Sequence, residues 1–521
     1  MTRKELINQV KSDTTWDIVI IGGGATGLGS AVEAVTRGYK TLLLEQYDFT
    51  IGTSSRSTKL VHGGIRYLAQ GHITLVLEAL KERGLLLKNA PHLVKNTSFL
   101  IPSYAWWYKP YYTIGLTLYD LLSGKLRFGK SIPFSRKKTI AKIPTLNKTK
   151  LRGSIKYHDG QFDDSRLGIN LVQTIIENGG TALNYMKVKN FIKKEEKICG
   201  VEAENQESGK HFSIKAKVVL NATGVFVDNL VQKDNPKAER IVKPSQGVHL
   251  VVDKKFLQSD YALMIPKTKS GSVMFAVPWH NKLILGTTDL PKDKAFIEPK
   301  ATEEEVDFIL ETAGQYLDNK PTRADVKSVF AGLRPLAAPK EDAKGKTKEI
   351  SRKHKIYTSK SGLVSIIGGK WTTYREMGKN AIDKLAILAN LPKKKSVTKN
   401  LRIHGYKQNG DKKNHLAFYG SDKENIEKLM KETPELCDWI CEDPLKINKA
   451  QVVWAVHHEY ARTVEDFLSR RTRVILLDAK KSVEIAPTVA KIMAKELGYD
   501  DDWVTQQVSS YTKLANGYLI K

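Results

Sequence analysis

The segment that most constrains this fold is residues 16–45, WDIVIIGGGATGLGSAVEAVTRGYKTLLLE. An apolar run breaks into the turn Gly22-x-Gly24-x-x-Gly27, and a helical pattern, a second apolar run and Glu45 follow. This order of strand, glycine turn, helix, strand and acid is the βαβ unit that binds a dinucleotide. The alternative is a glycine-rich turn without a ligand, but the flanking strands and the acid favour the dinucleotide site.

Each glycine of this turn has a physical role. Gly22 allows the sharp turn, Gly24 lets the backbone approach a pyrophosphate, and Gly27 lets the helix pack closely on the strand. The pyrophosphate then lies on free N–H groups at the positive end of the helix. Glu45 is placed to accept hydrogen bonds from a ribose diol and would repel a 2′-phosphate. The segment therefore predicts a dinucleotide without that phosphate.

The composition is that of a globular protein with a large core. With 521 residues, of which 41% are apolar and 27% charged, the chain is long enough for two to four domains. The three cysteines, Cys199, Cys437 and Cys441, have no second ligand pair near them, so neither a zinc site nor a disulfide framework is supported. The polar amino terminus does not predict a signal peptide, and no run of about 18 apolar residues predicts a transmembrane helix.

The net charge of +28 indicates an anionic partner. A membrane surface, a nucleic acid and a phosphorylated substrate all fit, as does a lysine-rich composition that serves solubility alone. Residues 99–128, FLIPSYAWWYKPYYTIGLTLYDLLSGKLRF, place two tryptophans and five tyrosines beside basic residues. This combination suits a membrane interface, and the alternative is a helix that packs on the domain with these aromatics in its core.

Strand and helix patterns alternate over most of the chain, which predicts an α/β fold. An apolar strand ends in Asn221-Ala222-Thr223-Gly224, a second turn of the kind that passes close to a bound cofactor. A third glycine turn, at Gly368-Gly369, opens a helix and presents free N–H groups.

The domain organisation follows from changes in these patterns. Residues 240–300 alternate apolar and polar side chains, so we expect an antiparallel substrate-side sheet mainly within residues 240–345. The charged segment around residue 395 divides a first region, 1–395, from a helical domain, 396–521. Helices are expected there over residues 423–431, 449–469, 482–497 and 502–515.

Four segments are long enough to compare with known families: GTSSRSTKLVHGGIRYL at residues 52–68, GLRPL at 332–336, GGKWTTYR at 368–375 and HHEYARTVEDFLSRRTR at 457–473. Together the chain resembles, over nearly its full length, the FAD-dependent glycerol-3-phosphate dehydrogenases, which are glycine-oxidase and D-amino-acid-oxidase-like flavoproteins. No surplus segment of the kind that the family's oxygen-using oxidases carry is evident, which favours a dehydrogenase. The resemblance implies a Rossmann-like FAD-binding domain, an interleaved antiparallel-sheet substrate domain and a C-terminal α-helical domain.

The resemblance also implies which residues surround FAD and the substrate. The ADP half is expected on Gly22, Gly24, Gly27 and Glu45, with Val188 as an adenine contact. The flavin and pyrophosphate are expected beside Thr53, Ser54, Ser55, Lys59, His62 and Gly64. Ala222 and Gly224 lie in the second turn, and Gly369 and Thr372 would face the N1 and O2 edge of the flavin. The substrate pocket is expected to contain Arg66, Tyr67, His249, Arg334, Arg352 and Lys370.

The expected substrate is sn-glycerol 3-phosphate, which would lose a hydride from C2 to flavin N5 and become dihydroxyacetone phosphate. Its phosphate needs several cations, for which Arg66, Arg352 and the catalytic candidate Lys370 are expected. His249 is the expected base for the hydroxyl proton, and Arg334 would stabilise the alkoxide. The alternatives are a hydrogen-bonded core histidine, a solvated charge at Arg352 and a buried ion pair at Arg334.

As electron acceptor the resemblance implies a membrane quinone, with the enzyme held peripherally at an anionic lipid surface on the cytoplasmic face of the inner membrane. The positive charge and the aromatic stretch would supply that attachment. The rival functions are a flavin-dependent amine or amino-acid oxidase and a basic flavoprotein that binds and modifies RNA. Because the basic residues are scattered and no aromatic-interleaved RNA motif is found, no nucleic acid is expected. The oligomeric state, a homodimer included, stays open.

Overall fold

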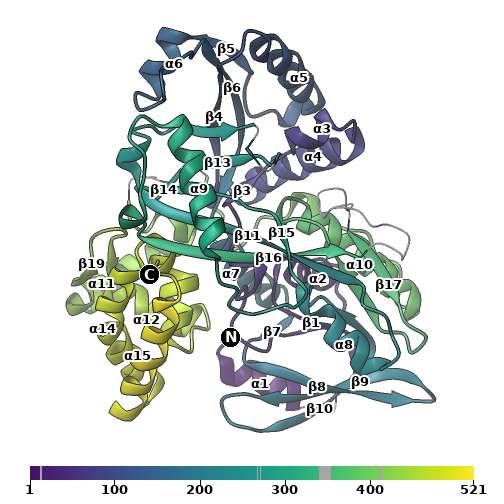
Figure 1. The fold of residues 1–521 in the computed structure, drawn as a ribbon. Helices are drawn as coiled ribbons and strands as arrows, with labels where there is room; N and C mark the ends of the chain where they lie inside the picture. The colour runs from purple at the N-terminus through teal and green to yellow at the C-terminus, as the bar shows by residue number, and fades with distance from the viewer. Residues whose placement is uncertain are drawn as a thin grey trace.

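The computed structural model describes residues 1–11, 14–266, 268–269, 271–338, 354–408, 410 and 414–520, with only the backbone of Arg66. Figure 1 shows a lower and an upper sheet, with a group of helices from the end of the chain beside them. The α/β fold class predicted from the sequence is confirmed by this arrangement.

The lower sheet is parallel at its centre. Its strands are β1 (Trp16–Ile21), β2 (Thr41–Leu44), β7 (Thr181–Leu183), β10 (His211–Asn221), β18 (Val364–Ile367) and the antiparallel β17 (Lys355–Thr358). They follow the order β17-β18-β10-β1-β2-β7, and the hairpin β8 (Met186–Lys194) and β9 (Lys197–Asn205) extends β10. The carboxyl ends of β1, β2 and β10 therefore lie next to one another, which is where open parallel sheets bind ligands.

Over this sheet, α2 (Ala25–Thr36) packs against α7 (Asp164–Glu177) and against α10 (Tyr374–Leu388). Two glycines let α2 and α10 approach closely. A Cβ on Gly29 would lie 2.6 Å from the carbonyl oxygen of Tyr374, and one on Gly378 would lie 2.4 Å from that of Gly29. The first helix, α1 (Arg3–Lys11), and α8 (Val227–Asp234) complete this part of the molecule.

The upper sheet is built from strands of three separate chain regions. They are β3 (Leu60–Val61), β4 (Val94–Ser103), β5 (Ile132–Ser135), β6 (Gly153–Phe162), β11 (Val242–Asp253), β12 (Ala262–Ile265), β13 (Met274–Trp279), β14 (Lys282–Gly286), β15 (Leu290–Pro291) and β16 (Ser328–Ala337). The order is β15-β11-β14-β13-β12-β4-β6-β3, with β16 beside β11 and β5 beside β6. The predicted strands of residues 240–345 thus pair with others from residues 60–162 that the alternation pattern did not indicate.

Five helices flank the upper sheet: α3 (Ile65–Ala69), α4 (Ile73–Asn89), α5 (Tyr108–Leu122), α6 (Arg136–Lys142) and α9 (Glu303–Tyr316). Of these, α9 begins with a capping box, in which the Thr302 side chain accepts from the backbone N–H of Glu305 and the Glu305 carboxylate accepts from that of Thr302. No helix among the described residues is both long and apolar enough to cross a bilayer.

The C-terminal helical group, residues 423–520, lies beside both sheets (Figure 1). Its helices are α11 (Lys423–Glu432), α12 (Lys449–His458), α13 (Val474–Leu477), α14 (Ala479–Leu497) and α15 (Asp501–Asn516). Their core includes side chains of the upper sheet, Trp279 and Phe330 among them. The division of the chain at residue 395 remains a prediction.

The prediction of one helix over residues 449–469 is wrong. Helix α12 ends at His458, Tyr460 has a left-handed φ of 58°, and a short π-helix, Asp466–Arg471, follows. The break is stabilised by the Asp466 carboxylate, which accepts hydrogen bonds from the backbone N–H groups of Arg462 (2.7 Å) and Thr463 (3.1 Å).

Candidate active site

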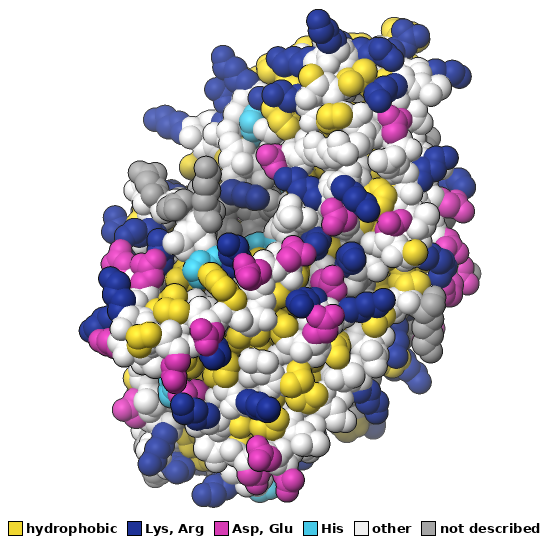
Figure 2. Space-filling view, turned by 90° about the vertical axis from the view of Figure 1, so that its left-hand side faces the viewer, with side chains coloured by type: hydrophobic (Ala, Val, Ile, Leu, Met, Phe, Trp, Pro, Cys, Tyr) yellow, Lys and Arg dark blue, Asp and Glu magenta, His cyan; other side chains and the backbone are white. Residues whose placement is uncertain are grey.

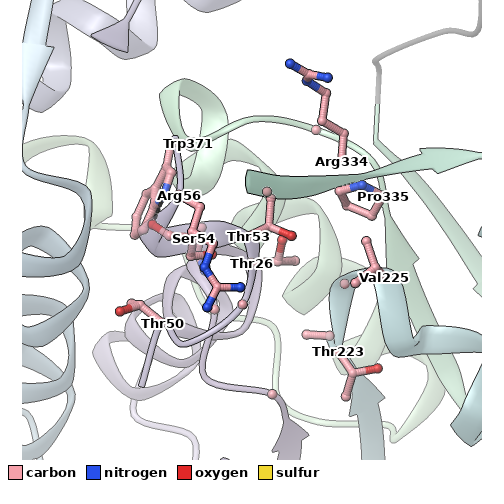
Figure 3. A pocket seen from close by; sticks show the side chains of 18 of the residues that line it. Thr26, Thr50, Thr53, Ser54, Arg56, Thr223, Val225, Arg334, Pro335 and Trp371 are labelled. Carbon is pink, nitrogen blue, oxygen red and sulfur yellow. Dashed lines mark hydrogen bonds between the residues drawn. The ribbon is translucent and has the colours of Figure 1, made fainter. Parts of the chain in front are cut away.

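A cavity of about 500 Å³ lies where the carboxyl ends of the parallel strands meet the upper sheet. Its wall contains the first glycine turn, the loop 50–58, the second turn after β10, parts of β11 and β16, and residues 368–372. Figure 3 shows Ser54, Arg56 and Trp371 on one side of it and Thr223 and Val225 on the other. Segments far apart in the sequence therefore converge on one site.

The two glycine turns contact each other at the floor of the cavity. A Cβ on Gly22 would lie 2.7 Å from the carbonyl oxygen of Ala222, and one on Gly27 would lie 1.8 Å from that of Gly22. Gly22 also has a φ of 110°, which side chains rarely allow. The cradle therefore requires glycine at these positions. Helix α2 begins here, with Gly24, Ala25 and Thr26 in the cavity wall, so its positive end faces the space.

Glu45 follows β2 and lies in the cavity wall, as the fingerprint predicts. Its carboxylate accepts hydrogen bonds from the backbone N–H groups of Gly23 (2.6 Å) and Tyr47 (2.9 Å). Burial raises the pKa of this carboxyl, and those two hydrogen bonds oppose the rise. A carboxylate held beside the first turn can accept hydrogen bonds from ribose hydroxyls. Val188, the predicted adenine contact, also lies in the wall.

The loop 50–58 forms the part of the wall next to β16. The Thr53 hydroxyl donates to the carbonyl of Leu333 at 2.5 Å, and the Trp371 indole N–H donates to the carbonyl of Ser54 at 2.9 Å. The Ser54 hydroxyl accepts from the backbone N–H of Ala25 at 2.9 Å, so the loop is also tied to the start of α2.

Most sequence-predicted cofactor residues lie in the cavity wall: Gly22, Gly24, Glu45, Thr53, Ser54, His62, Val188, Ala222, Gly224, Gly369 and Thr372. Four others lie outside it: Gly27, Ser55, Lys59 and Gly64. The Lys59 ammonium is fully buried behind the wall, where it donates to Asp164 and to the carbonyl of Ser55, both at 2.7 Å. Burial and Arg473 lower the pKa of Lys59 to about 7, although Asp164 opposes this.

His249 and Arg334 reach the cavity from the paired strands β11 and β16. The imidazole of His249 stacks on Phe330 at 4.8 Å between ring centroids, and its Nε2 lies 2.8 Å from the Thr58 hydroxyl oxygen. Its Nδ1 is buried and has no hydrogen-bond partner among the described residues. Burial and the charges of Arg334 and Lys59 lower the pKa of His249 to about 3.

Arg334 is held by the backbone as well as by an ion pair. Its guanidinium donates to the carbonyl oxygens of Gln246 and Thr288, both at 3.1 Å, and to the Asp289 carboxylate at 3.4 Å. The ion pair with an acidic residue, which is the alternative expected from the sequence for Arg334, is therefore present. Arg334 also lines the cavity, so the same side chain is both paired with Asp289 and exposed to the site.

Two further substrate-site candidates, Tyr67 and Lys370, lie together in the wall, with the Lys370 ammonium 4.1 Å from the centroid of the Tyr67 ring. Arg352 and the side chain of Arg66 lie outside the described residues. Arg56 and Thr58 also line the cavity and were not predicted as site residues. The signal for them is their position within the segment GTSSRSTKLVHGGIRYL, residues 52–68, which is rich in Ser, Thr and basic residues.

These features fit the predicted FAD. The glycine cradle and the N-terminus of α2 suit a pyrophosphate, and Glu45 suits a ribose. His249, Arg334 and Lys370 border the same space and can act on a small anionic substrate bound beside the cofactor.

Comparisons with known proteins show which family the chain is similar to. A family described as FAD dependent oxidoreductase matches residues 17–375, and one described as the C-terminal domain of alpha-glycerophosphate oxidase matches residues 364–504. The mitochondrial glycerol-3-phosphate dehydrogenase of Schizosaccharomyces pombe is 36% identical over 579 residues, covering 98% of this chain and 89% of the relative. The human mitochondrial enzyme is 36% identical over 550 residues, covering 98% and 75%. The X-ray structure of the glycerol-3-phosphate dehydrogenase from Bacillus halodurans, complexed with FAD, matches with a TM-score of 0.78 at 30% identity, over 99% of this chain and 98% of that one.

Proposed function

Because the chain belongs to the FAD-dependent glycerol-3-phosphate dehydrogenases, we propose that it oxidises sn-glycerol 3-phosphate to dihydroxyacetone phosphate. Bound FAD supplies the two-electron acceptor for the hydrogen at C2. The observation that carries the proposal is the placement of His249, Arg334 and Lys370 around the cavity that also contains the dinucleotide cradle.

In this proposal His249 removes the proton of the C2 hydroxyl. A general base must be neutral, and burial keeps the imidazole neutral at physiological pH. The same lowered pKa makes the ring a weaker proton acceptor than a free imidazole. The hydrogen bond at 2.8 Å between Nε2 and the hydroxyl of Thr58, which also lines the cavity, holds the imidazole in place for this proton transfer.

Arg334 stabilises the negative charge that grows on the substrate oxygen. Its guanidinium is fixed by two backbone carbonyls, so it needs little reorganisation when the charge develops. Lys370 contributes a second positive charge, and Tyr67 holds it by contact with the ring. We propose that Lys370, with Arg66 and Arg352, binds the phosphate.

The activity is tested by adding sn-glycerol 3-phosphate to the purified FAD-loaded protein without oxygen. The yellow absorbance of the flavin should fade within seconds, and dihydroxyacetone phosphate should appear in equal amount. Glycerol serves as the control because it lacks the phosphate, and glycine and D-alanine test the rival oxidase. If the flavin stays oxidised with glycerol 3-phosphate, or fades faster with an amino acid, the proposal is wrong.

We further propose that a membrane quinone reoxidises the protein, which attaches peripherally to an anionic lipid surface on the cytoplasmic face of the inner membrane. Support comes from α5 and the residues before it, where large apolar side chains are exposed: Trp106 (74%), Trp107 (47%), Tyr111 (52%), Ile114 (73%), Leu118 (43%) and Leu121 (68%). From Trp107 onward the spacing of three and four residues places them on one helix face, while Leu116 and Tyr119 are buried.

The surroundings of this face are basic. Figure 2 shows Lys and Arg side chains, with apolar ones among them, over the top of the molecule, where Figure 1 places α5, α6 and β5. An amphipathic helix with aromatic side chains and neighbouring cations suits the boundary between headgroups and acyl chains. Each nearby cation contributes roughly 1 kcal/mol at an anionic surface. Both alternatives for the aromatic stretch thus have support, since one face of α5 packs inward and the other faces outward.

A further inference from the structure

The loop 50–58 has a second side, which faces the C-terminal helical group. There Arg473, in a left-handed conformation (φ 72°) just before α13, is 1% exposed. One terminal nitrogen of its guanidinium donates to the carbonyl of Ser55 and to the carboxylate of Asp164, both at 2.7 Å. The other donates to the Ser165 hydroxyl at 2.7 Å and to the carbonyl of Ser469 at 2.9 Å.

Asp164 carries this contact into the loop. Its second carboxylate oxygen accepts from the Ser57 hydroxyl and from the Lys59 ammonium, both at 2.7 Å, and from the backbone N–H of Ser57 at 3.1 Å. Although burial alone would raise it, the charges of Lys59 and Arg473 hold the pKa of Asp164 below its ordinary value. The loop is thus attached to a fully buried, ionised carboxylate that Arg473 holds from the other side.

The cavity side of the same loop contacts the groups that matter for binding and catalysis. Ser54 accepts from Ala25 at the start of α2, and Thr58 contacts Nε2 of His249. The backbone between these two residues includes Ser55 and Ser57, which are the points that Arg473 and Asp164 hold. A shift of the loop would therefore move the cofactor wall and the base together.

We propose that Arg473 is a positioning residue, which acts through Ser55 and Asp164 to fix the loop 50–58 against FAD and to orient His249. In this proposal the C-terminal helical group packs on the sheets and also holds the loop 50–58 from the side that faces away from the cavity. The part that concerns His249 rests on the function proposed above, whereas the part that concerns FAD does not.

The chemistry of arginine explains why this position needs it. The planar guanidinium directs separate N–H groups at Ser55, Asp164 and Ser165, whereas a lysine ammonium is a compact point charge. The variant Arg473→Lys therefore keeps a cation beside the buried carboxylate and loses part of the hydrogen bonding. Arg462→Lys is a matched control, because Arg462 also joins the helical group to the FAD side, through Glu207 at 2.6 Å, and its hydrogen bonds within the described part of the chain do not reach the loop.

The experiment measures two quantities in the full-length protein: the affinity of the apo-protein for FAD, from quenching of FAD fluorescence, and the rate of anaerobic reduction by glycerol 3-phosphate. Arg473→Lys should weaken FAD binding and slow reduction, each by about tenfold or more, while the dissociation constant of the substrate changes by less than about threefold. Arg462→Lys should change neither quantity by more than about twofold. Thermal unfolding of both variants separates a general loss of stability from a local one.

A gentler variant keeps the test decisive if Arg473→Lys does not fold. Ser165→Ala removes one acceptor of Arg473 behind the wall, and with it the 3.2 Å contact between the Ser165 and Thr50 hydroxyls, which Thr50→Val removes alone. Ser165→Ala should weaken FAD binding by about threefold relative to Thr50→Val. The inference is overturned if Arg473→Lys binds FAD as tightly as the unaltered protein does. If Arg473→Lys does not fold, FAD binding by Ser165→Ala that is as tight as that by Thr50→Val overturns it. An equal loss of FAD affinity in Arg462→Lys would also overturn it. The FAD titration needs no substrate, so a protein that binds FAD but is not reduced by glycerol 3-phosphate would contradict only the proposed function.

Discussion

His249 differs from a free histidine in two ways that matter for its proposed role. Its ring is enclosed by Phe330 and Thr58, and its pKa is lowered from 6.5 to about 3, first by burial and then by Arg334. Since the folded-state pKa lies below the ordinary value, the unfolded chain binds the proton more readily. The protein therefore loses stability from this group as the pH falls through 6.5 toward 3, and the ring stays neutral above that range.

Replacing His249 with alanine should slow anaerobic flavin reduction by about 100-fold or more, because the hydroxyl proton loses its acceptor. In the unaltered protein, the rate of flavin reduction at saturating substrate should not fall near pH 6.5, because His249 is not protonated there. Stopped-flow absorbance between pH 5 and 8 measures both quantities. Near-normal reduction in His249→Ala would exclude it as the base, and a His249-dependent decline centred at pH 6.5 would contradict the lowered pKa.

At the scale of the secondary structure elements, the predictable features are those that depend on near neighbours in the sequence. The first turn, α2 and Glu45 form one local unit, so their pattern was sufficient to predict the cofactor cradle. Lys59 was expected beside the flavin, but its place behind the wall is decided by Asp164, 105 residues away. The break after α12 is not predictable from its own segment, because the carboxylate that stabilises it, Asp466, is held by the hydroxyl of Tyr185, 281 residues away.

The pairing of β11 with β16 could not be predicted from the sequence either. Both segments could be recognised as chemically interesting, since His249 lies in an apolar run and Arg334 lies in GLRPL. Their adjacency comes from the register of the sheet, in which His249 lies opposite Phe330 and Ser245 lies opposite Arg334. Residue type therefore indicated the candidates, and only the topology brings them to one cavity.

The outward face of α5 gives a prediction at this scale. Replacing Trp106, Trp107, Ile114 and Leu121 with serine should reduce binding to vesicles that contain anionic lipid by about tenfold or more, because the buried apolar area is lost. Co-sedimentation measures the binding, and high salt should weaken what remains because it screens the lysines. Anaerobic reduction of the flavin should be unaffected.

Helix α10 offers the matched control for this variant. Ile387 (72% exposed) and Leu388 (41% exposed) are also large apolar side chains at the surface, and they lie on a different part of the molecule. Replacing these two with serine should leave vesicle binding unchanged. If instead the α5 variant binds as the unaltered protein does, the membrane face has been misplaced.

At the scale of the whole molecule, buried ion pairs connect the C-terminal helical group to the FAD-binding part. They include Arg470 with Asp48 at 2.5 Å, Arg471 with Asp48 at 2.6 Å, Arg166 with Glu459 at 2.7 Å, and Arg473 with Asp164 at 2.7 Å. Breaking a buried pair leaves an uncompensated charge and costs about 3–5 kcal/mol. The helical group therefore does not separate from the cavity wall at low cost. A change in the position of the wall should also change the packing of the helical group.

This connection predicts how FAD affects the molecule. FAD at about 100 times its dissociation constant stabilises the folded protein by about 2.7 kcal/mol, so the melting temperature should rise. Because Ser55 and Asp164 transmit the constraint to Arg473, FAD should also slow hydrogen exchange in residues 466–477, which do not line the cavity. Mass spectrometry of exchanged peptides measures this, and α11 is the control because its packing partners lie within the C-terminal region. Protection confined to cavity-lining segments would show that the helical group only covers the sheets and takes no part in holding the cofactor.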